Sequence, residues 1–235
     1  MSRRRANDES EARGSTGERI LEILRTTPRP VGGPELAERL NVSRAAVWKH
    51  VRRLVAAGYR ISSDKVGGYR FEDRSTRLLP AEITRQLTTK RIGRVIHHFD
   101  AVDSTNRWAM DLARKGAAEG EAVIAESQTA GRGRLGRSFF SPASVSYYGS
   151  LILRPSLPPA RAPQITLLAG LAVAETIERH AGMRPGLKWP NDVHLGGLKV
   201  SGTLTEMESE ADRVLYVVTG TGVNLNLPQA EFPIE

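Results

Sequence analysis

The segment GRGRLGR, residues 131–137, holds three arginines and three glycines in seven positions and contains no acidic residue. Glycine adopts backbone conformations that other residues avoid, so neighbouring N–H groups can converge on an anion. Guanidinium groups neutralise phosphate or carboxylate oxygens and bind them through paired hydrogen bonds. The pattern therefore predicts an ordered anion-binding loop, and the alternative is a Gly/Arg turn with a purely structural role.

Familiar nucleotide-binding motifs do not fit this loop, although Gly131, Gly133 and Gly136 satisfy G-x-G-x-x-G. A dinucleotide-binding fingerprint needs a helix directly after the glycines and an acidic residue about twenty positions on. Here Pro142 interrupts any helix, and Arg154 stands near the acidic position. No Lys-Ser/Thr pair closes a P-loop, and an RGG-type RNA-binding segment would be longer.

A second polar segment, KWPNDVHLGGLK at residues 188–199, places Lys188, Asn191, Asp192 and Lys199 around a turn. Two cations, a carboxylate and an amide could together orient a triphosphate, a metal ion and an acyl carboxylate. Taken alone, the segment also fits a solvated turn held by salt bridges. Its chemistry therefore depends on whether the fold brings it close to residues 131–137, called the arginine loop below.

The elements that must position these two segments alternate between strands and helices. Apolar patterns predict strands at 94–102, 121–127, 147–153 and 213–226, and a hairpin over 192–207 that turns at Gly196 and Gly197. Helices are predicted from Ser104 or Thr105 onward and over 163–180, the latter apolar nearly all round and therefore well buried. This mixture predicts an α+β domain whose sheet is covered by helices.

The first third of the chain carries most of the positive charge. Residues 1–77 hold seventeen Lys and Arg against ten Asp and Glu, whereas residues 78–235 hold seventeen against sixteen. Three helices are expected, one capped by Ser15 or Thr16, one from Pro34 to Leu40 and one capped by Ser43, followed by two short strands around Gly67 and Gly68. This order predicts a winged helix-turn-helix, and the alternative is a three-helix module that contacts only proteins.

The third of these helices is the expected DNA-contacting element. Its apolar stripe, Val47, Val51, Leu54 and Val55, should pack inward and leave a basic face free for a DNA major groove. The predicted contacts are Ser43, Arg44 and Lys49 on the helix, with Lys65 on the wing as a phosphate contact. Trp48 is expected to pack against the protein rather than to stack on a base.

Composition restricts the setting of the protein. The 235-residue chain has no cysteine, which excludes disulfides and thiolate metal sites and fits the cytoplasm. No apolar run is long enough to cross a bilayer, and the polar segment after the basic start does not match a signal peptide. No set of metal-ligating side chains is predicted.

Four motifs, in this order, resemble those of biotin protein ligases: DSTN at 103–106, ESQTAGRGRLGRSFFSP at 126–142, KWPNDVHLGGLKVSGTLTE at 188–206 and GTGVNLN at 220–226. Because they follow a winged helix, the arrangement is similar to the repressor-type members of that family. The resemblance implies a winged helix-turn-helix DNA-binding domain at 15–76 and a mixed-sheet biotin/lipoate ligase-like catalytic domain at 80–235.

The family joins biotin and ATP, with Mg²⁺, into biotinyl-AMP and passes the biotinyl group to a lysine of a biotin carboxyl carrier protein. Carried over by motif, the implied substrate-binding residues are Ser104, Thr105, Asn106, Gln128, Arg132, Gly133, Arg134, Lys199 and Gly202. The implied ATP-binding residues are Arg134, Phe139, Lys188, Asn191 and Asn224. Lys199, Asp192 and Arg134 are the implied catalytic groups, with Lys199 on the acyl carboxylate and phosphate and Asp192 at the incoming amine.

Repressor-type members also bind operator DNA, and the resemblance implies that biotinyl-AMP favours a homodimer presenting two winged helices to a two-fold operator. In these members a small β-barrel domain follows the catalytic domain. The sequence ends at Glu235, so the catalytic domain is expected to be short at its C-terminus. Two alternatives therefore stay open: a biotin-sensing regulator with little or no ligase activity, and a related acyltransferase acting on lipoate or octanoate.

Overall fold

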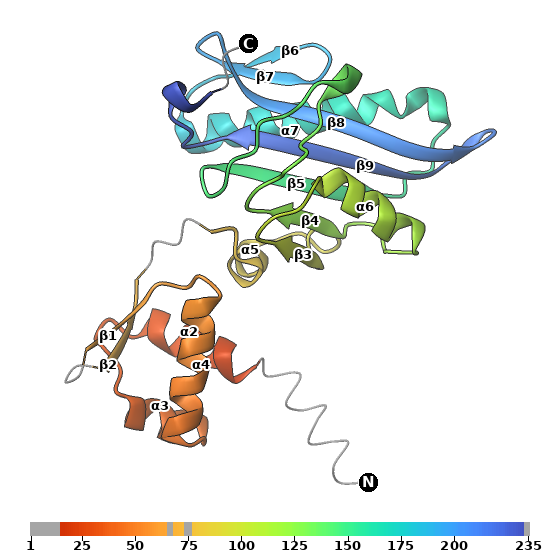
Figure 1. The fold of residues 1–235 in the computed structure, drawn as a ribbon. Helices are drawn as coiled ribbons and strands as arrows, with labels where there is room; N and C mark the ends of the chain where they lie inside the picture. The colour runs from red at the N-terminus through yellow and green to blue at the C-terminus, as the bar shows by residue number, and fades with distance from the viewer. Residues whose placement is uncertain (1–14, 65–67, 73–76, 233–235) are drawn as a thin grey trace, which may run out of the picture. The chain divides into compact units, whose positions relative to one another are not determined.

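The computed structural model describes residues 15–64, 68–72 and 77–232, which belong to two compact units divided after residue 75 (Figure 1). The first unit holds three helices and a two-stranded sheet, and the second holds a seven-stranded sheet with its helices. None of the helices in these ranges has the length and hydropathy that a membrane crossing requires.

The first unit is a winged helix-turn-helix. It contains α2 (Thr16–Thr26), α3 (Gly33–Leu40), α4 (Arg44–Ala56) and the antiparallel strands β1 (Ile61–Asp64) and β2 (Gly68–Phe71). Ser15 caps α2, and Asn41 ends α3 in the left-handed conformation, so both predicted helix ends are confirmed. The buried core consists of Ile20, Leu24, Val31, Leu36, Ala37, Leu40, Val47 and Val51.

The wing is attached to the helices by backbone pairing between Val31 and Tyr69. Each residue donates its N–H to the other's carbonyl, at 2.8 and 2.9 Å. Gly68 precedes this contact with a φ of 95°, and a Cβ at this position would overlap the Val31 carbonyl. Only glycine fits such a backbone without strain, which explains why residue 68, where the wing meets the core, is a glycine.

Two expectations about α4 are wrong. Trp48 is 56% exposed rather than packed, and Val55 is exposed although it continues the apolar stripe. The contacts of α4 with the core involve Val47, Val51 and the partly buried Leu54, and Trp48 is not among them. Lys65, the predicted wing contact, lies outside the described residues.

A seven-stranded mixed sheet organises the second unit. Its strands are β3 (Ile96–Phe99), β4 (Ala122–Ala125), β5 (Ser146–Leu153), β6 (Gly186–Lys188), β7 (Asp192–Leu195), β8 (Leu198–Glu210) and β9 (Arg213–Asn224). They lie in the order β3-β4-β5-β9-β8-β7-β6, in which β3 and β4 are parallel and the other neighbours are antiparallel. The predicted α+β class is confirmed, and the first strand is shorter than the predicted 94–102.

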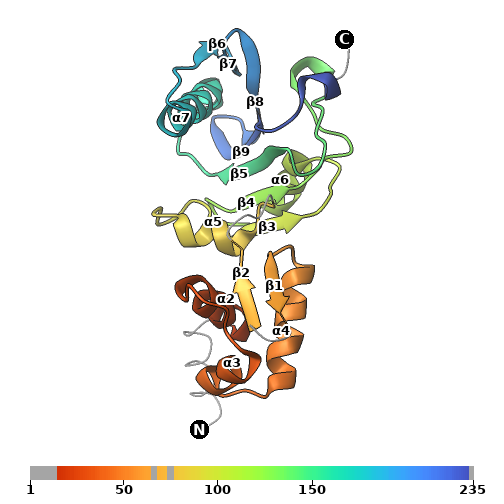
Figure 2. The same ribbon diagram turned by 90° about the vertical axis from the view of Figure 1, so that its left-hand side faces the viewer.

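Two helices, α6 (Thr105–Arg114) and α7 (Pro163–Ala181), cover opposite faces of this sheet, as the two views show (Figures 1 and 2). The buried Ala109 and Ala113 of α6 pack against Val123, Ile152 and Val218 of three strands. A shorter helix, α5 (Pro80–Gln86), precedes β3. Because α6 is fixed to the sheet through its alanines, its first residues lie at a defined place above the central strands.

The expectation that α7 is well buried is wrong. Its buried residues are Ile165, Gly170 and Ala174, whereas Leu168 is 64% exposed and its neighbours Leu167 and Leu171 are also exposed. A helix that covers one face of a sheet buries one side. The near-continuous apolar sequence of α7 could not indicate which side that would be.

Candidate functional site

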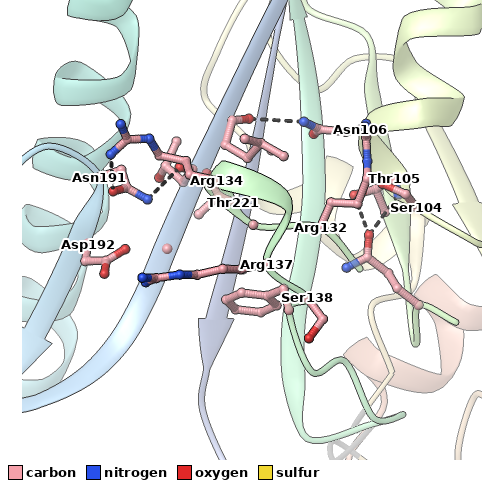
Figure 3. A pocket seen from close by; sticks show the side chains of 18 of the residues that line it. Ser104, Thr105, Asn106, Arg132, Arg134, Arg137, Ser138, Asn191, Asp192 and Thr221 are labelled. Atoms are coloured by element: carbon pink, nitrogen blue, oxygen red, sulfur yellow. Dashed lines mark hydrogen bonds between the residues drawn. The ribbon is translucent and has the colours of Figure 1, made fainter. Parts of the chain in front are cut away.

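One cavity of about 220 Å³ in the second unit collects most of the predicted site residues (Figure 3). Its walls come from the start of α6, the segment 128–139, the β7–β8 hairpin and β9. The predicted residues that line it are Ser104, Thr105, Asn106, Gln128, Arg132, Gly133, Arg134, Phe139, Asn191, Asp192, Lys199 and Gly202. The DSTN, GRGRLGR and KWPND motifs, far apart in the sequence, therefore meet at one place.

The start of α6 is fixed by the carboxylate of Asp103. It accepts the N–H of Ser104 at 2.6 Å and pairs with Arg107 one turn along. Burial alone raises the pKa of Asp103, but the hydrogen bond from Ser104 and the pairing with Arg107 outweigh burial, so the pKa lies below its ordinary value of 3.8. A carboxylate that stays ionised at the N-terminus of a helix also stabilises that helix.

Gln128 connects this helix end to the arginine loop. Its amide oxygen accepts the N–H of Thr105 at 2.9 Å, and its amide nitrogen donates to Ser141 Oγ at 3.0 Å. Ser141 in turn donates to the carbonyl of Phe139 at 2.8 Å. An isolated bridge between Gln128 and Val102 adds backbone pairing nearby. The side chains of this polar wall are therefore held before any ligand arrives.

The cationic side of the cavity faces the polar wall. Lys199 Nζ lies 2.8 Å from Asp192 Oδ1, and Arg134 donates to Asn191 Oδ1 at 3.2 Å. Asn191 donates in turn to the carbonyl of Thr203 at 3.1 Å. Figure 3 shows the side chain of Arg137 extending across the cavity toward Asp192. Three cationic side chains thus surround one carboxylate and one amide.

Two glycines form part of the floor of the cavity. A Cβ at Gly220 would overlap the amide oxygen of Asn106, and a Cβ at Gly222 would overlap the ring of Phe139. Both glycines lie on β9, at the centre of the sheet. Glycine at these two positions therefore lets the side chains of Asn106 and Phe139 lie directly against β9.

The arginine loop closes on itself. The N–H groups of Gly133 and Phe139 donate to the carbonyls of Arg137 and Gly131, at 2.7 and 2.8 Å. Those two N–H groups already bond within the loop, so they are not free to bind an anion as expected. The guanidinium groups of the loop supply its positive charge instead. At the tip, Leu135 has a φ of 56° and is 89% exposed, an unusual conformation for a branched residue.

A larger cavity of about 620 Å³ adjoins the far side of this loop. It shares Arg132, Arg134 and Leu135 with the first cavity, and Glu206 and Met207 of β8 complete it together with the start of α7. The loop therefore separates two spaces, and Arg132 lines both.

Two predicted ATP-binding residues, Lys188 and Asn224, lie outside the cavity lining. Lys188 is exposed on the edge strand β6, opposite Asp192 in the register. Asn224 ends β9 opposite Ser146 of β5. Both belong to matching motifs, and the structure does not bring either to the cavity.

Sequence reasoning missed several residues of the site. Arg137 and Glu206 lie inside the motifs, but neither was predicted to be a site residue. Arg137 lines the cavity, and Glu206 pairs with Arg132 and hydrogen-bonds Asn106. Thr203 also lines the cavity, and its buried hydroxyl has no partner among the described residues. The place of Arg137 as the third arginine of the GRGRLGR segment was a signal that could have identified it. No local pattern distinguishes Glu206, a single glutamate on a strand.

No cluster of three or more His, Cys, Asp or Glu side chains in the described ranges is placed to hold a metal ion. Asp192 does supply one carboxylate inside the cavity, beside the amide oxygen of Asn191. One or two oxygen ligands with a phosphate-bearing substrate are the usual setting of Mg²⁺. The site therefore fits a magnesium ion that arrives with a nucleotide.

The first unit presents a separate candidate surface on α4. Arg44, Lys49, Arg52 and Arg53 are exposed there, and none has an ion-pair partner among the described residues. The guanidinium of Arg52 lies 5.3 Å from the centre of the Trp48 ring. Ser43, predicted as a DNA contact, caps the helix by accepting the N–H of Ala46 at 3.1 Å. Unpaired cations on an exposed helix are typical of nucleic-acid-binding surfaces.

Comparison with known proteins identifies both units. Residues 98–224 match the biotin/lipoate A/B protein ligase family, and residues 17–70 match an HTH domain. The "Bifunctional ligase/repressor BirA" of Bacillus spizizenii is 41% identical over 205 residues, which cover 87% of this chain and 63% of that protein. The protein of the same name from Escherichia coli is 34% identical over 85% of this chain and 60% of its own length. The chain thus spans about three fifths of these relatives.

Parts of two solved structures are also similar to part of this chain. The biotin protein ligase from Aquifex aeolicus in complex with biotin and ATP is 34% identical, with a TM-score of 0.49 over 60% of this chain and 55% of that chain. The Leishmania major ligase in complex with biotinyl-5-AMP is 29% identical, with a TM-score of 0.47 over 57% and 59%. Since the family match covers more than half of the sequence, the chain belongs to the biotin/lipoate A/B protein ligase family.

Proposed function

We propose that the protein is a biotin protein ligase that also acts as a DNA-binding repressor of biotin genes. The predicted catalytic domain, residues 80–235, would form biotinyl-AMP from biotin and ATP and transfer the biotinyl group to a lysine of a biotin carboxyl carrier protein. The predicted DNA-binding domain, residues 15–76, would bind operator DNA. The observation that carries the proposal is the single cavity in which the DSTN, GRGRLGR and KWPND motifs meet.

The polar wall suits the cyclic urea of biotin. A urea presents two N–H donors and one carbonyl acceptor, so its site needs both acceptors and donors. Thr105 and Gln128 supply a hydroxyl and an amide, held in place by the hydrogen bond from the Thr105 N–H to the Gln128 amide oxygen. A site built in this way rejects analogues that lack the matching groups, because its own polar atoms would be left unpaired.

In the first step, a carboxylate oxygen of biotin attacks the α-phosphorus of ATP. The bond from that phosphorus to the bridging oxygen breaks, and pyrophosphate leaves. Negative charge accumulates on the phosphoryl oxygens, and Lys199, Arg134 and Arg137 line the cavity in positions to neutralise it. Mg²⁺, which Asp192 and Asn191 would hold together with the phosphates, would supply further charge neutralisation.

In the second step, the Nζ of a carrier lysine attacks the acyl carbon of biotinyl-AMP, and the bond to the AMP oxygen breaks. A free lysine with a pKa of about 10.4 is mostly protonated at neutral pH, so a nearby carboxylate helps to position and deprotonate it. Asp192 is the carboxylate that lines the cavity and is therefore proposed for this role.

The repressor role depends on α4 and on a dimer. The unpaired cations of α4 support binding to the DNA backbone. A homodimer would present two such helices to a two-fold operator, and biotinyl-AMP would favour the dimer by ordering the arginine loop. The proposal predicts that operator affinity at fixed salt rises with biotinyl-AMP.

The proposal is tested by incubating the purified 235-residue protein with biotin and Mg·ATP and measuring biotinyl-AMP by mass spectrometry. Formation of the adenylate supports the ligase, and its absence with biotin still bound supports a second candidate. That candidate is a biotin-sensing regulator with little ligase activity, favoured by the position of Asn224 outside the cavity. Replacing biotin by lipoate or octanoate separates both from a related acyltransferase.

A further inference from the structure

Glu206 links the two walls of the ligand cavity. Its Oε2 atom accepts a hydrogen bond from Asn106 Nδ2 at 2.8 Å, and it lies 2.6 Å from a guanidinium nitrogen of Arg132. Asn106 belongs to the start of α6 and Arg132 to the arginine loop, whereas Glu206 belongs to β8. One carboxylate thus holds two segments of the site without touching the space where the ligand would react.

The orientation of the Asn106 amide follows from its neighbours. Its nitrogen faces Glu206 Oε2 and, at 3.1 Å, the carbonyl oxygen of Leu204. Both of these atoms can only accept hydrogen bonds, so the nitrogen, with its two protons, must point toward them. The amide oxygen of Asn106 then faces Ser150 Oγ at 2.6 Å, and Asn106 itself is only 4% exposed.

This orientation fixes the next hydrogen bond. Ser150 Oγ lies 2.6 Å from the Asn106 oxygen and 2.8 Å from Thr105 Oγ1. A hydroxyl has one proton, and an amide oxygen can only accept, so the Ser150 proton lies on the Asn106 side. Ser150 must then accept a hydrogen bond from Thr105, because a 2.8 Å contact between two hydroxyl oxygens without a proton is repulsive.

The hydroxyl proton of Thr105 is consequently used inside the protein. Its other neighbour, Gln128 Oε1 at 3.1 Å, already accepts the Thr105 N–H and is also an acceptor. With its proton directed to Ser150, Thr105 Oγ1 offers only lone pairs to the cavity. The wall is therefore an acceptor at this point, which suits a ligand N–H and disfavours a ligand carbonyl.

We propose that Glu206 is a positioning residue for ligand recognition: through Asn106 and Ser150, its carboxylate sets the direction of the hydrogen bonds that make Thr105 an acceptor toward the ligand. The inference rests on the proposed function in that biotin supplies the N–H group. Glu206 itself contacts neither biotin nor the reacting atoms.

The test compares biotin affinity, by calorimetry, among variants of the full chain. Glu206→Met removes the acceptor at similar size, and biotin Kd should rise about tenfold to a hundredfold, the value of a charge-assisted hydrogen bond. Glu206→Gln keeps an amide oxygen that can accept from Asn106, so it should restore part of the affinity. Glu210→Met removes a carboxylate from the same strand, one that pairs with the nearby Arg213 at the surface, and should leave Kd unchanged.

A double-mutant cycle distinguishes a relay from simple structural support. Glu206 has no direct hydrogen bond to Ser150 in the relay, yet Glu206→Met and Ser150→Ala should interrupt the same chain of bonds. Their combined effect on biotin Kd should be close to the larger single effect. Additive effects of the two variants would overturn the proposal, and so would a Kd in Glu206→Met within about twofold of the wild type.

Two further readouts complete the test. The rate of adenylate formation at saturating biotin should change by less than about threefold in Glu206→Met, since a large fall in kcat would place Glu206 in the reaction instead. In the ligand-free protein, the side-chain amide protons of Asn106 should exchange slowly by NMR and faster in Glu206→Met. If the wild type binds no biotin, the proposed function fails, while unchanged exchange at Asn106 overturns the role of Glu206 independently.

Discussion

Lys199 Nζ and Asp192 Oδ1 lie 2.8 Å apart, on the two strands of the β7–β8 hairpin. This ion pair joins the cation proposed for the first chemical step to the carboxylate proposed for the second. A phosphate group entering the cavity would compete with Asp192 for Lys199, because both are anions. The arrival of the nucleotide would thereby release Asp192 to interact with an incoming amine, which gives the two steps a natural order.

Lys199→Met should lower the rate of biotinyl-AMP formation by about a hundredfold to a thousandfold, the usual effect of removing one group that stabilises transition-state charge. The measurement is single-turnover mass spectrometry of biotinyl-AMP. Lys115→Met is a matched control, because Lys115 is exposed at the C-terminal end of α6 and does not line the cavity. Equal losses in the two variants would contradict the assignment to Lys199.

Asp192→Asn should separate the two steps. Adenylate formation should fall by less than about tenfold, because the phosphates and the Asn191 amide oxygen would still hold Mg²⁺. Transfer to a carrier lysine should fall by about a hundredfold, since the carboxylate that assists the amine is lost. Transfer is measured by adding a carrier domain to preformed biotinyl-AMP on the protein. If both rates fall together, Asp192 acts mainly by holding Lys199.

Gly220→Ala should displace the side chain of Asn106 from its place against β9. The added Cβ would overlap the amide oxygen of Asn106, and relieving such an overlap commonly costs about 1–3 kcal/mol. We expect biotin affinity to fall at least about tenfold by calorimetry. Gly186→Ala, on strand β6, is the control, because its Cβ would meet no atom within 4 Å. Unchanged binding in Gly220→Ala would mean that ligand binding does not depend on the position of Asn106.

Arg52→Ala should weaken binding to duplex DNA and reduce its dependence on salt. One phosphate contact contributes about one unit to the slope of log K against log salt, so the slope should fall by about 1. Fluorescence anisotropy across a salt series measures both quantities. Arg29→Ala serves as the control, because Arg29 is already paired with Glu35 at 2.9 Å and lies outside α4. A slope equal to the wild type would remove Arg52 from the DNA surface.

Glu121 should make the stability of the second unit depend on pH. A hydrogen bond from His97 at 2.8 Å holds the pKa of Glu121 below its ordinary 4.5, against the opposing effect of burial. A lowered pKa in the folded state stabilises the protein above the unfolded value, and this contribution is lost as pH falls through the folded value. Glu121→Gln should therefore lower the free energy of unfolding at neutral pH and flatten its acid decline.

Urea unfolding at a series of pH values between about 3 and 7 tests this prediction. His97→Gln removes the other partner of the same hydrogen bond and should reproduce the effect. If the free energies of Glu121→Gln and the wild type differ by a constant amount at every pH, the ionisation of Glu121 is not the cause.

Local signals in the sequence predicted much of the fold. Ser43 and Asn41 determine helix ends within one or two residues of themselves, and the hairpin turns at Gly196 and Gly197 because both adopt positive φ. Such features depend on neighbouring residues. The motifs located most of the cavity lining for a similar reason, since each motif is a short run whose residues share one loop or strand.

Long-range relationships could not be predicted in this way. The hydrogen bond between Asn106 and Glu206 joins residues one hundred positions apart, and no local pattern links them. The exposure of Trp48 and Leu168 depends on which side of a helix another element covers. Hydrophobicity alone describes the helix and not its neighbours, so both residues were expected to be buried.

The walls of the ligand cavity come from four separate stretches, within 104–106, 128–139, 191–204 and 220–222. The site therefore exists only once the sheet, α6 and the arginine loop have come together, and an unfolded chain cannot hold the ligand. A ligand present at one hundred times its Kd raises the free energy of unfolding by about 2.7 kcal/mol. Because proteases remove unfolded chains, the supply of ligand would also govern the lifetime and abundance of the protein in the cell.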